Sequence, residues 1–159
     1  MKYVTTADVQ DGCVFCAYAE QQPDATCGVL ARARHNFVVL NAFPYNSGHM
    51  MVVPYEHQSD FTALPAATLE EMMALAQIAV AVLQQEFRCE GANVGLNIGK
   101  AAGAGIKDHL HLHIVPRWGG DTNFMTALDD TRVVPQSLED TWAGLAPCLQ
   151  RGIAEAKLA

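Results

Sequence analysis

The spacing of apolar and polar residues divides the chain into short extended segments and two helices. Apolar and β-branched residues fill positions 28–33, 36–40, 49–53 and 92–98, which are short enough for strands. Pro54 follows the third of these segments and favours its end there. We therefore predict several short strands, mostly antiparallel, joined by tight connections.

A long helix is predicted to begin at Thr68. Thr68 and Glu71 have the spacing of a capping box, and Gly91 is expected to stop the helix. Apolar residues at steps of three and four predict its buried stripe, namely Leu69, Met72, Met73, Ala76, Ala79, Val80, Leu83 and Phe87. A last helix is expected from residue 137, with Pro147 kinking or interrupting it. With no repeat and no linker composition, the pattern predicts one α+β domain over residues 1–159.

The most regular alternation in the chain is His-Leu-His-Leu-His-Ile-Val at residues 109–115. It predicts a strand with His109, His111 and His113 on one face, and an apolar face formed by Leu110, Leu112 and Ile114. Alternate strand residues lie about 6.6–7 Å apart, too far for three rings to converge on one small ion. A row of ring nitrogens facing a polyanion fits this spacing, and the alternative is a solvated polar face.

Composition narrows the class of protein. Half of the 159 residues are hydrophobic and 17% are charged, which indicates a compact globular chain. A net charge of −7 argues against a duplex nucleic-acid binder. We find no stretch that approaches a membrane span of roughly 18–20 apolar residues, and no signal-peptide core, so we expect a cytoplasmic protein without a membrane partner. Five cysteines do not resemble a disulfide framework.

The histidine pattern resembles the defining motif of the histidine triad superfamily of nucleotide hydrolases and transferases. The resemblance extends over the order of elements from Cys13 to Arg117, including Gly-His-Met-Met-Val-Val-Pro at residues 48–54. The segment 116–125 is further similar to the bacterial branch related to diadenosine tetraphosphate phosphorylases and hydrolases. The resemblance implies a histidine-triad-like fold: a mostly antiparallel sheet, one long helix and a C-terminal helix.

The resemblance also implies a two-step nucleotidyl transfer. His111 would attack the α-phosphorus of a nucleoside polyphosphate or phosphoramidate, because neutral imidazole is a competent nucleophile near pH 7. Protonated His113 would stabilise phosphate charge, and His109 completes the triad. Water, or phosphate in a phosphorylase, would then release the nucleotide. His49 is expected to have a supporting role near the site.

Other residues match the family's phosphate and nucleotide contacts. The phosphate-binding turn corresponds to Gly103 through Gly105 and Ile106, where relatives often place Ser or Thr at the last position. Asn97 matches an asparagine near the leaving group, and Asn41 a ribose-binding residue; turn and capping roles are the alternatives. Phe15 and residues 37–40 are expected to supply an apolar wall, or ordinary core.

Arg117, Trp118 and Asn123 follow the triad. The first two could hold a second nucleotide by charge and stacking. The alternative is a tryptophan that closes the edge of the core beside a surface arginine.

The pair Cys13 and Cys16 leaves three interpretations open on its own: a zinc site, a redox pair or neither. The thioredoxin-like context that a redox pair needs is absent. Resemblance to the zinc-bearing branch of the family implies a closed, structural zinc site of Cys13, Cys16, His57 and His109. The remaining cysteines are expected to be small apolar residues, namely Cys27, Cys89 and Cys148.

The leading hypothesis is therefore an enzyme acting on dinucleoside polyphosphates or related adenylylated nucleotides. The alternatives are a phosphate-dependent phosphorylase, a nucleotide sensor with vestigial turnover, and a zinc-stabilised interaction protein. Relatives pair through the long helix and an adjacent strand, so a homodimer is also expected.

Overall fold

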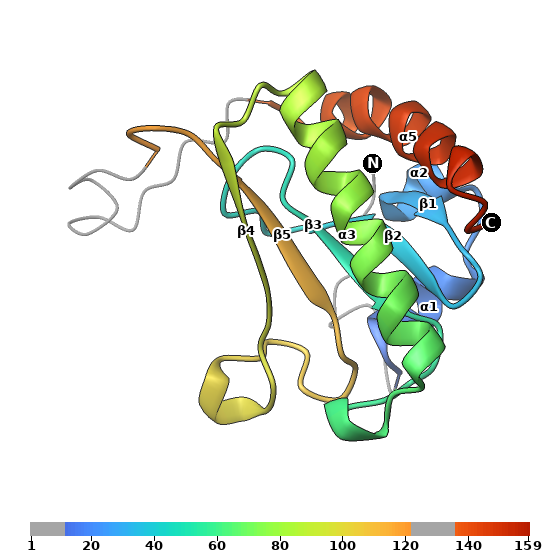
Figure 1. Cartoon of the computed structure of the whole chain (residues 1–159). Coiled ribbons are helices and arrows are strands. Elements are labelled where there is room, and N and C mark those ends of the chain that lie inside the picture. Colours follow the sequence, from blue (N-terminus) through green and yellow to red (C-terminus); the bar gives the residue numbers. More distant parts are fainter. Residues whose placement is uncertain (1–11, 122–135) are drawn as a thin grey trace.

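The computed structural model describes residues 12–121 and 136–159. Five strands form one sheet in the order β1-β2-β3-β5-β4, and every neighbouring pair is antiparallel (Figure 1). The strands are β1 (Val29–Arg32), β2 (Asn36–Leu40), β3 (Met50–Pro54), β4 (Gly91–Leu96) and β5 (Leu112–Arg117). The helices are α1 (Val14–Glu20), α2 (Asp24–Cys27), η1 (Phe61–Ala63), α3 (Ala66–Glu86), η2 (Lys100–Ala102) and α5 (Leu138–Glu155). The α+β prediction is confirmed.

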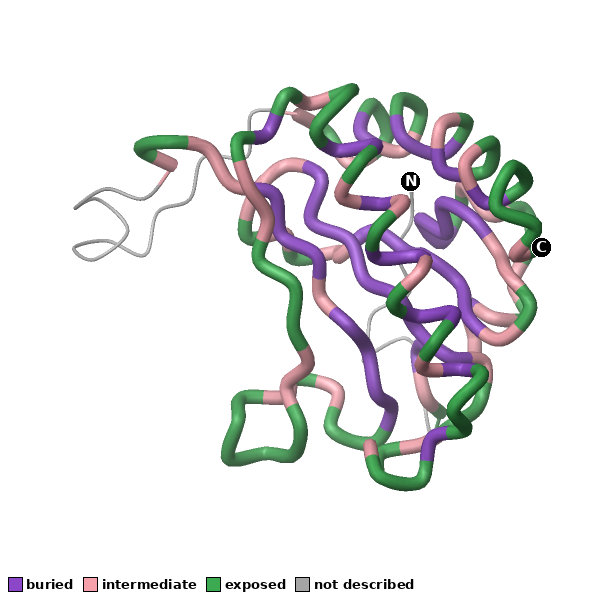
Figure 2. Tube along the Cα trace, viewed as in Figure 1, coloured by how far each residue is buried: buried purple, intermediate pink, exposed green. Residues whose placement is uncertain are grey.

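Each face of the sheet carries its own core. Helices α3 and α5 pack together over one face, where they meet Val38, Val52 and Ile114. Helix α1 covers part of the opposite face through Phe15, which joins a second cluster of Phe37, Val39, Met51 and Val53. Because side chains alternate along a strand, β2 and β3 contribute to both cores, and Figure 2 shows them buried along their whole length.

The start of α3 differs from the sequence expectation. The helix begins at Ala66, after Pro65, so Thr68 lies inside its first turn and caps nothing. Glu71 is 7% exposed and its Oε1 accepts hydrogen bonds from the backbone N–H groups of His35 and Asn36 at 2.8 Å each. The Asn36 side-chain amide donates to the same oxygen at 2.9 Å. The predicted capping box is wrong because Glu71 is instead engaged by the turn between β1 and β2.

The buried stripe and the end of α3 also differ in part. Leu75 and Val82 are buried, whereas Met73 is 55% exposed. The helix ends at Glu86, and Gly91 is the first residue of β4 rather than the helix stop. Gly91 pairs with Arg117, and the Glu90 N–H donates to the Arg117 carbonyl at 2.9 Å. Glu90 and Gly91 are therefore paired with β5 and do not form the end of the helix.

Helix α3 corrects one further expectation from composition. It has 21 residues, and an 18-residue window in it has a mean hydropathy of 1.5, so by length and composition it could cross a membrane. The statement that no stretch approaches a membrane span is therefore wrong for this helix. Its buried side packs on the sheet and on α5, which is the arrangement of a core helix.

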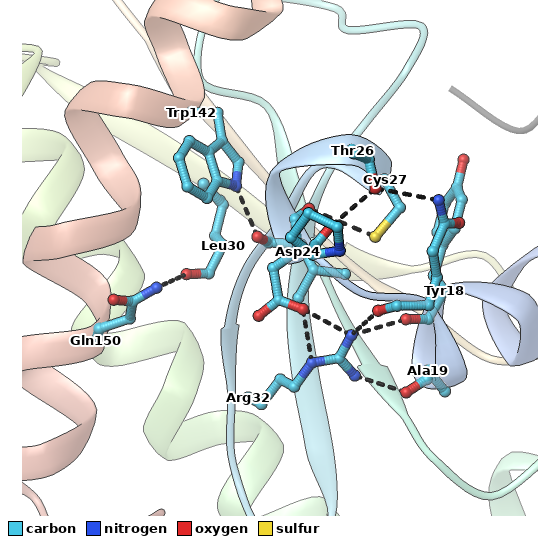
Figure 3. A network of polar contacts seen from close by, with 12 residues as sticks. Tyr18, Ala19, Asp24, Thr26, Cys27, Leu30, Arg32, Trp142 and Gln150 are labelled. Atoms are coloured by element: carbon cyan, nitrogen blue, oxygen red, sulfur yellow. Dashed lines mark hydrogen bonds and ion pairs between the residues drawn. The ribbon is translucent and has the colours of Figure 1, made fainter. Parts of the chain in front are cut away.

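Helix α5 covers the outer edge of the sheet at β1. Ser137 caps its first turn by accepting the Asp140 N–H at 3.0 Å, and the helix continues through Pro147 without the expected interruption. The Trp142 indole donates to the Val29 carbonyl at 2.6 Å (Figure 3). The Gln150 amide donates to the Leu30 carbonyl at 3.1 Å. By contrast, the middle of the opposite edge strand, β4, is exposed (Figure 2).

Arg32 anchors the end of α1 to β1. Its guanidinium donates to the carbonyls of Ala19 at 2.7 Å, Tyr18 at 2.9 Å and Gln21 at 3.1 Å (Figure 3). Its Nε donates to Asp24 at 2.9 Å. Carbonyls at a helix C-terminus lack partners within the helix, so one arginine satisfies several of them. This contact fixes the helix that forms one wall of the site described below.

Candidate functional site

A cavity of about 360 Å³ opens beside the histidine segment. Nine residues singled out from the sequence line it: Asn41, Asn97, Gly103, Gly105, Ile106, His111 and His113, together with Phe15 and Leu40 from the expected apolar wall. Apolar residues from α1 and the neighbouring strands form further lining, namely Val14, Tyr18 and Met51. The loop after β2 contributes Ala42, Phe43 and Tyr45. The described lining includes no lysine or arginine, so its polar groups are imidazoles, amides and backbone.

The strand that carries the histidines is shorter than predicted. β5 begins at Leu112, so His109 and His111 precede it and only His113 lies within the paired region. His113 is registered opposite Met51 on β3 and Gly95 on β4. Leu112 joins the core beneath α3, as the alternation predicts. The histidines face the other side, toward α1.

His111 has one ring nitrogen committed to the backbone. Its Nδ1 lies 2.9 Å from the carbonyl oxygen of His109, and because a carbonyl only accepts, Nδ1 carries the proton. The lone pair of the neutral ring is then on Nε2. Burial lowers the pKa of His111, which keeps the ring neutral and nucleophilic near pH 7. The ring lines the cavity and packs 5.1 Å from that of Phe15.

A chain of hydrogen bonds fixes the tautomer of His113. The Tyr45 N–H donates to His49 Nδ1 at 3.1 Å, so the His49 proton lies on Nε2. His49 Nε2 lies 3.0 Å from His113 Nδ1 and donates to it. The proton of neutral His113 is therefore on its own Nε2. His49 has the supporting role expected of it.

His113 is not a cation in the ligand-free protein. Burial, together with the nearby His111, lowers the pKa of His113 to about 4. The ring is thus neutral near pH 7 and can donate only one hydrogen bond through Nε2. The protonated form expected from the resemblance requires an anion in the cavity to raise this pKa.

The predicted phosphate and ribose contacts lie around the same cavity. Gly103 has φ of 84°, a left-handed conformation that favours glycine, and ends the short helix η2. Asn41 is also part of a turn, because its Oδ1 accepts the Phe43 N–H at 3.0 Å. Its amide nitrogen lies 3.3 Å from His49 Nδ1. The turn interpretation of Asn41 and its presence at the site are therefore compatible.

Arg117 and Trp118 do not line this cavity. The Arg117 guanidinium pairs with Asp121 through two contacts of 2.6 and 2.7 Å and donates to Asn93 at 2.9 Å. Trp118 packs against the core beneath α3 and α5. Asn123 lies outside the described residues. A nucleotide-binding role for Arg117 and Trp118 stays a prediction.

The four residues proposed as zinc ligands meet beside the cavity. The side chains of Cys13, Cys16, His57 and His109 each offer one ligand atom, and these atoms lie within 4.8 Å of one another. Cys13 Sγ and Cys16 Sγ lie 3.2 and 3.7 Å from His109 Nδ1, and Cys16 Sγ lies 3.3 Å from His57 Nδ1. Ligands around a tetrahedral zinc ion are separated by about 3.3–3.8 Å, given its bond lengths. The cluster therefore fits a Cys₂His₂ zinc site.

His109 belongs to the cluster and to the triad at once. Its Nε2 lies 2.8 Å from the Pro54 carbonyl and must donate to it, which leaves the lone pair on Nδ1 facing the cysteines. Its own carbonyl accepts from His111. His109 thus links the Cys₂His₂ cluster to His111, the candidate nucleophile.

Sequence reasoning missed several residues of the lining. Val14, Tyr18 and Met51 were not singled out, and neither were Phe43 and Tyr45. The helical spacing of Val14 and Tyr18 on α1 is a signal that could have placed them on one face with Phe15. Phe43 and Tyr45 carried no such signal, because they belong to a loop whose path depends on the folded sheet.

Comparisons with known proteins agree with this geometry. The HIT domain family matches residues 22–120. The AP-4-A phosphorylase of Mycobacterium tuberculosis is 48% identical over 113 residues, which cover 71% of this chain and 58% of that protein. The chain thus spans well under two thirds of the length of that relative. A 16.1 kDa HIT-like protein of Mycoplasma pneumoniae is 28% identical over 83% of this chain and 88% of its own length.

A solved structure extends the likeness to three dimensions. A zinc-bound histidine triad family protein from Mycobacterium smegmatis superimposes with a TM-score of 0.71 at 27% identity. The superposition covers 91% of this chain and 97% of the other. The family match covers more than half of the residues, and two histidines of the triad line the cavity. The chain belongs to the HIT domain family of histidine triad proteins.

Proposed function

We propose that this protein transfers a nucleotidyl group from a dinucleoside polyphosphate through a covalent intermediate on His111. One observation carries the proposal: the His111 tautomer leaves its Nε2 lone pair unprotonated in a ring that lines the cavity. The similarity to a protein named AP-4-A phosphorylase supports this class of substrate. Apolar lining around Phe15 suits a nucleobase, and the imidazole and amide groups suit phosphates.

The chemistry takes two displacements at one phosphorus atom. In the first, His111 Nε2 attacks the α-phosphorus and forms a P–N bond, while the P–O bond to the leaving polyphosphate breaks and its electron pair stays on that oxygen. In the second, an acceptor oxygen attacks the same phosphorus and the P–N bond breaks, which returns the lone pair to His111. The His109 carbonyl stabilises the positive charge on the ring between the two steps.

His113 would stabilise the phosphate oxygens. Its Nε2–H donates in the neutral ring, since His49 fixes the proton there. Burial lowers the pKa of His113, and the negative charge of a bound polyphosphate would raise it again. A proton taken up by the ring would then give a charge-assisted hydrogen bond to the phosphate. The backbone N–H groups around Gly103 and Gly105 are the remaining donors in reach of the cavity.

We propose inorganic phosphate as the preferred acceptor in the second step, because the relative named a phosphorylase is 48% identical. Phosphate attack yields a nucleoside diphosphate, and no proton must be removed from a phosphate oxyanion. Water as acceptor yields a nucleoside monophosphate and releases one proton to solvent. Products from diadenosine tetraphosphate with and without phosphate distinguish the two. The first step releases ATP in either case, so formation of AMP in place of ADP beside ATP at saturating phosphate would refute the phosphorylase assignment.

A nucleotide sensor is the alternative from another class. It would bind the nucleotide in the same cavity without forming the P–N bond. Rapid quenching with denaturant at alkaline pH, followed by intact-protein mass spectrometry at neutral or alkaline pH, tests this directly. The P–N bond of a phosphohistidine-type adduct survives under these conditions, whereas acid hydrolyses it. An adenylylated protein that disappears on substitution of His111 supports the enzyme, and nucleotide binding without an adduct or product supports the sensor.

We further propose that Cys13, Cys16, His57 and His109 hold a structural zinc ion. The donor set and the separations between donors fit tetrahedral coordination, and a relative of similar fold is described as zinc-bound. Zinc bound there would add no Lewis acid to the reaction, because all four positions are filled by side chains. It would instead fix His109, whose carbonyl orients the nucleophile.

The assembly and location follow as two smaller proposals. The outer side of β4 is exposed at Asn93, Val94 and Gly95, so a second copy could pair with this edge and with the adjacent part of α3 to form a homodimer. Light scattering that gives a monomer mass at micromolar concentration would exclude this. We propose a cytoplasmic location, where nucleotide substrates are present.

A further inference from the structure

The rings that line the cavity follow one another in a fixed order. The ring centroid of Phe15 lies 5.1 Å from that of His111, and His111 lies 4.8 Å from His113. Tyr45 comes next, with its ring 6.5 Å from His113 and stacked on His49 at 4.8 Å. The two site histidines thus lie between a Phe15 end and a Tyr45 end.

The two ends differ sharply in exposure. Phe15 is 1% exposed, and its neighbours Val14 and Tyr18 are buried as well. At the other end Tyr45 is 50% exposed. Phe43, which precedes Tyr45 by two residues in the same loop and also lines the cavity, is 75% exposed. A planar group at the Phe15 end would be enclosed by protein. At the Tyr45 end it would lie on an aromatic rim at the protein surface.

The backbone of this rim is held in place. Asn41 Oδ1 accepts the Phe43 N–H at 3.0 Å, and His49 Nδ1 accepts the Tyr45 N–H at 3.1 Å. Scattered exposed apolar residues are ordinary on protein surfaces. Phe43, however, is the most exposed large apolar side chain among the residues that the structure describes, and it borders the cavity. A stacked ligand would remove its ring from water without ordering the loop first.

We infer that Phe43, together with Tyr45, stacks against the leaving nucleoside of a dinucleoside polyphosphate. The inference rests on the proposed function and adds a specificity-determining surface to it. With the reacting phosphorus at His111, one base extends toward Phe15 and the rest of the molecule passes His113 toward Tyr45 and Phe43. The rim then favours substrates that carry a base at both ends over substrates with one base, because every base offers a face for aromatic stacking.

Kinetics with two substrates test this. Diadenosine tetraphosphate has a leaving group with a base, and adenosine 5′-phosphoramidate loses only ammonia. Phe43→Ala is expected to lower the ratio of kcat/KM for the first substrate over the second by roughly tenfold, the usual effect of losing one stacked base. Phe43→Trp should keep the ratio near the wild-type value. Phe61→Ala, a matched change in η1 away from the described cavity lining, should not alter it. An unchanged ratio in Phe43→Ala would overturn the inference.

A binding measurement separates this inference from the proposed reaction. In a His111→Asn background, calorimetry gives Kd for diadenosine tetraphosphate and for AMP without turnover. Adding Phe43→Ala should weaken the binding of diadenosine tetraphosphate roughly tenfold. The preference for diadenosine tetraphosphate over AMP, given by the ratio of their Kd values, should fall by the same factor. That result supports the rim even if the wild-type protein turns over neither substrate. Equal weakening of both ligands, or of neither, refutes the rim whatever the catalytic result.

Discussion

His109 and His111 are joined by a hydrogen bond from the Nδ1–H of one ring to the backbone carbonyl two residues earlier, at 2.9 Å. The same His109 directs its own Nδ1 toward the two cysteines, 3.2 and 3.7 Å away. One short segment therefore sets the tautomer of the proposed nucleophile and completes the proposed metal site. The predictions below separate these two roles and test the surroundings of each.

Replacing the nucleophile should abolish turnover and leave the fold intact. His111→Asn retains an N–H donor for the His109 carbonyl but has no nucleophilic nitrogen to attack phosphorus, so we expect kcat to fall by at least roughly 10⁴-fold. His111→Ala should be equally inactive. Circular dichroism melts of both variants serve as the folding control. Substantial residual activity in either variant would refute the assignment.

Purified protein should contain about one equivalent of zinc, measured by plasma mass spectrometry on samples prepared without chelators. Cys16→Ser should lower both the zinc content and Tm, because a structural ion contributes directly to folding. Cys148→Ser, a half-buried thiol on α5 that contacts Glu86, should retain the metal. Less than about half an equivalent of zinc in the wild-type protein would contradict the proposal, since structural sites bind tightly.

The low pKa of His113 makes stability depend on pH in a definite direction. The folded protein binds a proton at His113 with a pKa of about 4, whereas an unfolded chain binds it near 6.5. Between these values the unfolded state holds more protons, so the free energy of unfolding decreases as the pH falls from 6.5 to 4. Chemical denaturation should show that the free energy of unfolding falls less between pH 7 and pH 5 in His113→Gln than in the wild type. Equal losses would show that His113 titrates normally.

Removing the Arg32 anchor should loosen α1. Arg32→Ala leaves carbonyls at the end of α1 without donors, and we expect a loss of about 2 kcal/mol in the free energy of unfolding. Because α1 carries Cys16 and Phe15, zinc affinity should fall as well. Arg34→Ala, an exposed arginine in the adjacent turn, should change stability by no more than about 0.5 kcal/mol. Competition with a chromogenic zinc chelator gives the affinity.

A substitution at Gly105 should affect ligand binding without affecting packing. A Cβ placed there meets nothing within 4 Å, so Gly105→Ala should fold with unchanged or slightly higher stability. The residue lines the cavity, however, and a methyl group would occupy space that the proposed phosphates need, so we expect roughly tenfold weaker nucleotide binding. Gly144→Ala on α5 also meets nothing and should bind normally. Wild-type affinity in Gly105→Ala would argue that phosphates do not approach this turn.

Local periodicity was enough to predict the sheet and most of the strands, because alternation and Pro54 are properties of a few consecutive residues. It was not enough for α3. The Thr68 and Glu71 pair has capping-box spacing, yet Glu71 accepts three hydrogen bonds from the turn at His35 and Asn36, more than thirty residues away. A capping-box pattern does not predict the structure where the glutamate is buried and accepts hydrogen bonds from residues distant in the sequence.

The site shows the same division. The triad was predicted because its chemistry is concentrated in one alternating segment, and the ligand set of Cys13, Cys16, His57 and His109 was predicted from the resemblance to zinc-bearing relatives. The neutral state of His113 was not, since it depends on how deeply the fold buries the ring and on His111 beside it. The positions of Arg117 and Trp118 were equally beyond a local pattern. Asp121 draws the arginine into an ion pair at its own end of β5.

The contacts of Trp142 and Gln150 with β1 limit how copies of this protein can associate. Helix α5 covers the β1 edge of the sheet, so among the strands that the structure describes β4 is the one left open to strand addition. Two molecules that meet there through the same strand use up the single open margin of each. In such a pair no edge of the described sheet would remain for a third copy, so strand pairing of this kind would end at two molecules and would not grow into a fibre.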